Sequence, residues 1–126
     1  MRTLYLLRHA KASQAAGATQ DHERPLTAEG VAAATALGAY LKGRGHDLGH
    51  VVCSTSRRTI ETYENVARAF PGLDATLEPR VYEADSKQLL ALVRGMSPGD
   101  STATIIGHNP GTAEVSLALA GGGDLN

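Results

Sequence analysis

Three short apolar runs, each followed by a polar loop and then a helical pattern, constrain the fold of this chain more than any other feature. The runs cover residues 3–7, 51–53 and 102–106, and a weaker extended stretch covers 75–78. Short apolar runs of this kind are typical of strands that are covered on both faces of a mostly parallel sheet. The alternation predicts an α/β fold with helices on both faces of a central sheet.

The helical patterns are bounded by residues that favour helix starts and stops. Helices are expected over residues 27–41, 56–70, 86–94 and 110–120. Thr27, Ser86 and Asn109 are suitable N-caps, and Pro110 suits the first helical position. Pro-Gly at residues 71–72 is expected to end the second helix.

Composition places the chain among single globular domains. Its 126 residues fit one domain, 1–126, and 42% of them are apolar against 20% charged. The net charge of -1 gives no general attraction to nucleic acid or to an acidic membrane. Cys53 is the single cysteine and cannot form an internal disulfide, and the first apolar run is too short for a signal peptide. We therefore expect a cytoplasmic protein with no nucleic-acid or membrane partner.

Basic groups follow each of the three clear strands. Arg8 and His9 follow the first, Arg57 and Arg58 follow the second, and His108 follows the third. The carboxyl ends of strands form the ligand crevice of open α/β sheets, and arginine matches phosphate oxygens with paired hydrogen bonds. The pattern indicates an anion site. The histidines form no compact metal-ligand motif, and no P-loop sequence occurs, so we predict neither a metal nor another cofactor.

Five segments together resemble a known family. They are LRHAKAS at 7–13, RPLTAEG at 24–30, CSTSRRTIET at 53–62, VYEAD at 81–85 and IIGHNPG at 105–111. In this order they are similar to the histidine phosphatase superfamily, and most similar to its short SixA-type branch. The resemblance implies a phosphoglycerate mutase-like three-layer sandwich around a mostly parallel sheet. Because members usually extend further, we expect either that the last strand and helix are absent or that the sequence is incomplete.

The resemblance also implies roles for individual residues. It places His9 as the phosphorylated nucleophile, Arg8 and Arg58 as phosphate-binding arginines, and His108 as the second pocket histidine. Glu83 lies where related phosphatases have their proton donor, and a solvated loop carboxylate is the alternative for this residue.

Three further points concern the second, third and fifth motifs. Arg24 and Asn109 are secondary candidates at the pocket edge. The family usually has Ser-Pro before the second arginine and Gln-Thr after it, whereas this chain has Ser-Thr at 54–55 and Glu-Thr at 61–62. Arg58 is preferred to Arg57 because its spacing to both flanking motifs matches the family.

The expected reaction is phosphoryl transfer to His9 followed by attack of water. A protonated phosphoimidazole leaves as neutral imidazole and needs less acid catalysis than an alkoxide, so a phosphohistidine of a protein is the favoured substrate. Two alternatives stay open: a small-molecule phosphomonoesterase that uses Glu83 as its acid, and a catalytically silent module that binds phosphoprotein. The sequence does not indicate an oligomeric state.

Overall fold

Four parallel strands form the sheet of the described part of the chain. The computed structural model describes residues 3–14, 20–82, 84–95 and 102–108. The strands are β1 (Thr3–Arg8), β2 (His50–Cys53), β3 (Ala75–Leu77) and β4 (Thr102–Gly107), in the order β1-β4-β2-β3. All pairs are parallel. The α/β prediction is confirmed, and the weak stretch at 75–78 contains strand β3.

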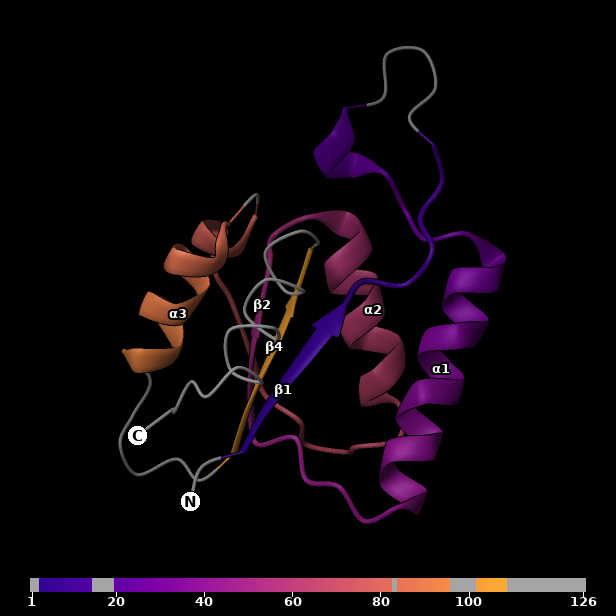
Figure 1. Cartoon of the computed structure of the whole chain (residues 1–126). Helices are drawn as coiled ribbons and strands as arrows, with labels where there is room; N and C mark the ends of the chain where they lie inside the picture. Colours follow the sequence, from indigo (N-terminus) through magenta and orange to yellow (C-terminus); the bar gives the residue numbers. More distant parts are fainter. Residues whose placement is uncertain (1–2, 15–19, 83, 96–101, 109–126) are drawn as a thin grey trace.

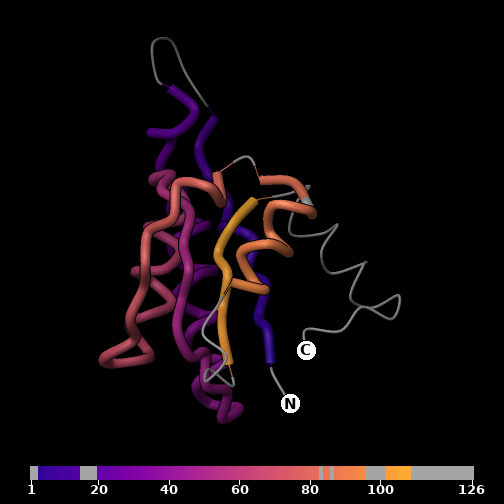
Figure 2. Tube along the Cα trace, turned by 90° about the vertical axis from the view of Figure 1, so that its left-hand side faces the viewer, coloured from indigo at the N-terminus to yellow at the C-terminus, as the bar shows by residue number. Residues whose placement is uncertain are grey.

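The helices cover both faces of the sheet. Helices α1 (Ala28–Gly43) and α2 (Arg57–Ala67) lie on one face, and α3 (Ser86–Arg94) lies on the other (Figure 1). The side view in Figure 2 shows the strands between these two layers. The chain moves in one direction from β1 through β2 to β3 and returns to β4, so right-handed crossovers put the last helix on the opposite face. The three-layer prediction is confirmed.

Alternate residues of each strand contribute to two different layers of the core. Ile105 packs with Leu89 and Val93 of α3, together with Leu4 and Leu6. The neighbouring strand positions face α1 and α2 and include the residues Tyr5, Val51, Cys53 and Ile106. Strands β1, β2 and β4 are therefore apolar on both sides, which is why the sequence shows continuous apolar runs there.

The helix starts agree with the sequence at two positions and differ at one. Thr27 caps α1 by accepting a hydrogen bond from the amide of Gly30, and Ser56 caps α2. Helix α3 is capped by Asp85, not by Ser86 as predicted. The Asp85 side chain accepts from the Gln88 amide while the Gln88 side chain accepts from the Asp85 amide. This reciprocal pair satisfies two amides, and a cap at Ser86 would satisfy one.

Helix α2 ends at Ala67, three residues before the predicted end at Phe70. The following turn is tighter, because Phe70 donates its amide to the Ala67 carbonyl, three residues back. After this turn Phe70 lies inward and is buried with Val66 in the core under α1. The predicted helix 110–120 and its cap Asn109 lie outside the described residues.

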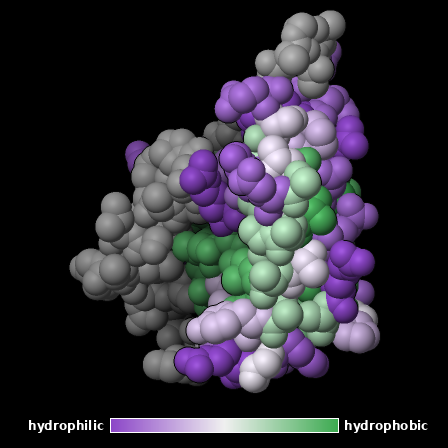
Figure 3. All heavy atoms as spheres, turned by 90° about the vertical axis from the view of Figure 1, so that its right-hand side faces the viewer, coloured by the Kyte–Doolittle hydropathy of each residue, from purple (hydrophilic) through white to green (hydrophobic). Residues whose placement is uncertain are grey.

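Helix α1 has little contrast in hydrophobicity between its faces, because most of its alanines lie on the exposed face and two of the four buried residues are glycines. Its outer face exposes Ala32, Ala33, Ala36 and Tyr40. Figure 3 views this side and shows hydrophobic side chains along its middle between hydrophilic ones. On the inner face, a Cβ on Gly38 would lie 2.5 Å from the Val66 carbonyl oxygen of α2, so only glycine permits this approach. No helix among the described residues is long and apolar enough to cross a membrane.

Candidate active site

The register of the sheet brings the two predicted pocket histidines together. Strands β1 and β4 pair Arg8 with Gly107, so the next residues, His9 and His108, leave the sheet side by side. The His9 amide donates to the Gly107 carbonyl at 3.1 Å, and the two imidazole centroids are 5.3 Å apart. Ser54 leaves the adjacent strand β2 at the same edge. One edge of the sheet thus holds groups that lie far apart in the sequence.

His9 is held in one tautomer, with its Nδ1 engaged by the backbone. Its Nδ1 lies 2.7 Å from the Ala10 carbonyl oxygen, which can only accept, so Nδ1 carries the hydrogen. Nε2 then bears the lone pair of the neutral ring. Burial lowers the pKa of His9, the bond to Ala10 opposes this, and the positive charges of Arg58 and Arg8 lower the pKa further. The neutral ring is therefore favoured.

His108 is also neutral. Its Nδ1 lies 3.4 Å from Nη2 of Arg58, which can only donate, and its Nε2 lies 2.8 Å from the Ser54 hydroxyl. Nδ1 is therefore an acceptor, and Nε2 carries the hydrogen and donates it to Ser54. Burial and then the charge of Arg58 lower the pKa of His108 to about 4. The positive charge of the site accordingly resides on its arginines.

The two adjacent arginines at the start of α2 point in different directions. The side chain of Arg58 is 7% exposed and reaches His108, whereas that of Arg57 is 53% exposed and pairs with Glu61 at 3.0 Å. The difference follows from helix geometry, since neighbouring residues lie about 100° apart around the axis. Arg8 is exposed at the end of β1, and its charge acts on His9.

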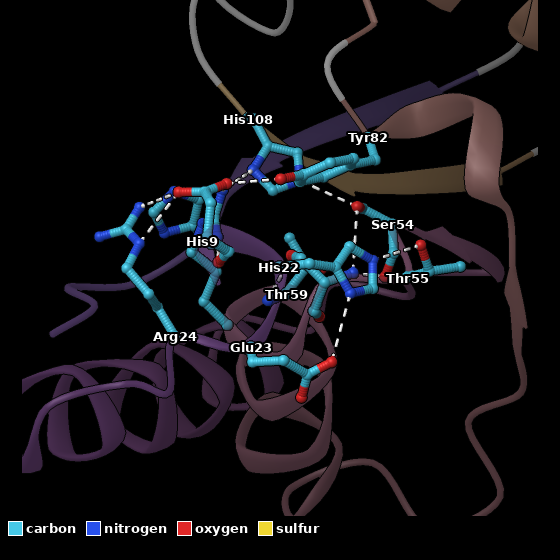
Figure 4. Close-up of polar contacts among 12 residues, drawn as sticks. His9, His22, Glu23, Arg24, Ser54, Thr55, Thr59, Tyr82 and His108 are labelled. Carbon is cyan, nitrogen blue, oxygen red and sulfur yellow. Dashed lines mark hydrogen bonds and ion pairs between the residues drawn. The ribbon is translucent and has the colours of Figure 1, made fainter. Parts of the chain in front are cut away.

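A short 3-10 turn, η1 (Asp21–Glu23), adds a carboxylate to the site. The Asp21 carboxylate accepts hydrogen bonds from Arg24, Arg58 and Tyr82. Figure 4 shows Arg24, Tyr82 and His108 gathered around the same region as His9. The bonds from Tyr82 and Arg58 lower the pKa of Asp21 to about 2, although burial opposes them, so its carboxylate is charged.

Two aromatic rings continue the site outward from His108. The Tyr82 ring meets His108 edge to face with centroids 5.5 Å apart, and it meets His22 in the same way at 4.9 Å. Nε2 of His22 lies 2.9 Å from the Thr55 hydroxyl, so this ring is held in place (Figure 4). In the motif VYEAD the sequence pointed to Glu83, and no role was predicted for Tyr82. The tyrosine beside the predicted acid was the available signal.

A family model identifies the chain. The model of the histidine phosphatase superfamily (branch 1) matches residues 4–93, more than half of the sequence. The chain belongs to this superfamily. The resemblance seen in the five motifs is thereby confirmed.

Individual relatives place this histidine phosphatase near the SixA-type branch. A solved structure of a protein assigned as the phosphohistidine phosphatase SixA of Agrobacterium tumefaciens is 32% identical, with a TM-score of 0.90 over 96% of this chain and 79% of that one. The protein histidine phosphatase SixA complexed with tungstate gives a TM-score of 0.81 at 24% identity, over 90% of this chain and 74% of that one. An uncharacterized Mycobacterium leprae protein is 32% identical over 95% of this chain and 74% of its own length.

The structure describes some of the remaining candidate residues and not others. Arg24 lies at the pocket edge, bound to Asp21 and to the Ser13 carbonyl. Glu83 and Asn109 lie outside the described residues, so their roles stay predictions. No cluster of three or more histidine, cysteine or acidic residues suited to a metal ion occurs in the part of the chain that the structure describes.

Proposed function

We propose that this chain is a phosphohistidine phosphatase that dephosphorylates a protein through a phosphorylated His9. The observation that carries this proposal is the state of the His9 ring, whose Nδ1–H is held by the Ala10 carbonyl at 2.7 Å. This bond leaves the Nε2 lone pair available for attack, in a site whose positive charge resides on arginines. The solved relative complexed with tungstate, an oxyanion shaped like phosphate, supports an oxyanion site in this fold.

The first step forms phospho-His9. Arg8 and Arg58 would hold the phosphoryl oxygens, and His108 would join them by turning its Nε2 hydrogen from Ser54 to the phosphoryl group, while Nε2 of His9 attacks phosphorus. The bond from phosphorus to the substrate ring breaks, and its electron pair returns to the ring nitrogen. If the other ring nitrogen of the substrate is protonated, the product leaves as neutral imidazole. No further acid is then required.

The second step releases phosphate. Water attacks the phosphorus of phospho-His9 and loses a proton, and the electron pair of the P–N bond returns to Nε2. The products are inorganic phosphate and the original His9. No metal is needed in these steps, because arginine and histidine donors stabilise the charge of the phosphoryl oxygens. Turnover is accordingly expected to survive a chelator.

Labelling tests the intermediate. Wild-type protein mixed with ³²P-phosphohistidine peptide and quenched in alkali should carry acid-labile label, which His9→Asn should lack. His50→Asn is the matched control, since His50 lies at the opposite end of β2, is exposed and bonds to Thr76. Turnover by wild-type protein without label on His9 would contradict the mechanism.

The substrate class is tested separately with Glu83→Gln. Loss of a general acid typically costs about 10²–10⁴-fold on an alkoxide leaving group. We expect a loss of that size on sugar phosphates and little loss on phosphohistidine peptide. Equal losses on both, or wild-type turnover confined to sugar phosphates, would favour the small-molecule phosphomonoesterase. Binding of phosphohistidine peptide without turnover or label would indicate the silent binding module.

A further inference from the structure

Asp21 places a carboxylate among the arginines of the proposed phosphate site. The Asp21 side chain repels an incoming phosphate, yet it lies among the arginines of the pocket. Its Oδ1 accepts from Nε of Arg24 at 3.0 Å and lies 3.0 Å from Nη2 of the same residue. Its Oδ2 accepts from Arg58 at 3.1 Å and from the Tyr82 hydroxyl at 2.5 Å. The lone pairs of both oxygens are thus engaged by protein donors.

Asp21 holds Arg58 at two points. Nη1 of Arg58 donates to the Asp21 backbone carbonyl at 2.8 Å, and Nη2 donates to the Asp21 carboxylate at 3.1 Å. Two bonds from one planar guanidinium to one residue fix the orientation of the plane. In that orientation Nη2 also reaches Nδ1 of His108 at 3.4 Å. The orientation of Arg58 toward the histidines therefore depends on Asp21.

The burial of the arginines gives the same carboxylate an electrostatic role. The side chains of Arg58 and Arg24 are 7% and 19% exposed, so neither charge is well solvated. Both bond to Asp21, which brings two cations together at one carboxylate. A buried charge is costly unless it is paired and hydrogen-bonded. Asp21 offsets this cost for both arginines at once.

We infer that Asp21 is a positioning residue of the phosphate site, which holds the Arg58 guanidinium against His108 without contacting the substrate. The inference rests on the proposed function, because that assigns Arg58 to the phosphate. Asp21 has no proton to give in this arrangement, since its oxygens only accept. It acts on phosphate binding through Arg58.

A double-mutant cycle with tungstate as the probe tests this inference. Calorimetry gives the tungstate Kd of wild type, Asp21→Asn, Arg58→Ala and the double variant. We expect Asp21→Asn to weaken tungstate by about 10-fold, as for residues that orient the ligands of other sites. The double variant should bind no more weakly than Arg58→Ala, since a residue that acts through Arg58 has no effect once Arg58 is removed. Asp21→Glu keeps the charge and should recover part of the tungstate affinity. This variant provides the test if Asp21→Asn folds poorly.

The control lies in the same turn. Glu23 has a 66% exposed side chain and lies 3.7 Å from Nδ1 of His22. Glu23→Gln changes the charge of the segment by the same amount and should leave the tungstate Kd unchanged. With phosphohistidine peptide, Asp21→Asn should raise KM more than it lowers kcat, which a general loss of folded protein would not do.

Each other outcome has a distinct meaning. Tighter tungstate binding by Asp21→Asn would show that Asp21 competes with phosphate and would overturn the inference. Additive losses in the double variant would also overturn it, because Asp21 would then act independently of Arg58. If Arg58→Ala itself leaves the tungstate Kd unchanged, the proposed phosphate site is wrong. If only Asp21→Asn has no effect, the proposed function stands and the inference fails.

Discussion

Thr62 joins the loop that carries His9 to the helix that carries Arg58. Its replacement by valine tests how far the proposed nucleophile, His9, depends on this connection. The Thr62 side chain is 1% exposed in α2. Its hydroxyl accepts from the Ala10 amide at 3.0 Å and donates to the Arg58 carbonyl at 2.7 Å. Ala10 in turn holds Nδ1 of His9. The position of the His9 ring is therefore linked to α2 through one hydroxyl group.

Thr62→Val keeps the shape of the side chain and removes both hydrogen bonds. A buried amide left without an acceptor costs about 1–3 kcal/mol, and Ala10 is half-buried, so we expect a loss of about 1–2 kcal/mol in the free energy of unfolding. For a domain of this size the melting temperature falls by about 4–8 °C. A shift of the Ala10 peptide also turns the His9 ring away from its line of attack. Misplacement of about 1 Å can cost 10²-fold, so kcat should fall by about 10- to 100-fold.

Thermal unfolding and single-turnover transfer to His9 measure the two effects separately. Thr35→Val is the matched control, because the Thr35 hydroxyl of α1 donates to the Val31 carbonyl at 2.8 Å and lies 3.3 Å from Oδ1 of Asn65 in α2, and neither bond involves Ala10 or Arg58. That variant should keep kcat and lose less stability. If Thr62→Val keeps the wild-type kcat despite the expected loss of stability, the Ala10 carbonyl does not set the orientation of the nucleophile.

Three further predictions concern the pH dependence of activity, the pH dependence of stability, and helix packing. Because the pKa of His9 is lowered from 6.5, kcat/KM measured across the acid range should decline only below pH 6.5, as protonation removes the lone pair; a decline beginning above it would contradict a neutral, partly buried ring. The lowered pKa of His108, about 4, means that the unfolded chain binds a proton first, so urea unfolding should show stability falling as pH drops from 6.5 toward 4. Gly38→Ala places a Cβ 2.5 Å from the Val66 carbonyl oxygen and should cost about 1–3 kcal/mol by urea unfolding, since α1 and α2 must separate. Gly43→Ala, with nothing within 4 Å of the new Cβ, is the control and should cause no loss.

The parts of the site that follow from strand ends and helix phase could be predicted from the sequence. His9 and His108 each come directly after an apolar strand. Parallel strands end at the same edge of the sheet, so the two histidines lie close together once their strands are neighbours in the sheet order. Arg58, chosen over Arg57 from its spacing to the flanking motifs, is the arginine that reaches His108. These positions depend on local periodicity and on the general rules of parallel sheets.

The contacts of Asp21 could not be predicted in this way. Its bonds to Arg58 and Tyr82 join residues 37 and 61 positions apart, across a loop whose path no periodicity specifies. Only the pairing with Arg24, three residues away, has a local signal. The predicted cap of α3 was wrong for a related reason. Asp85 and Ser86 are both residue types that favour N-caps, and the choice between them depends on which backbone amide the Gln88 side chain can reach.

The division of charge in the site explains how His9, the proposed nucleophile, can stay neutral beside arginines. Burial, and then the charges of Arg58 and Arg8, lower the pKa of His9 and so favour the neutral ring that attack requires, and in the proposed site the same charges attract the phosphate. Were His9 itself the cation, it would bind phosphate but could not attack it. In the proposed site Asp21 completes this division, because its carboxylate is bound to both Arg58 and Arg24 and offsets their mutual repulsion. Arg58 can therefore stay charged and oriented toward His108, where it is proposed to bind the phosphoryl group.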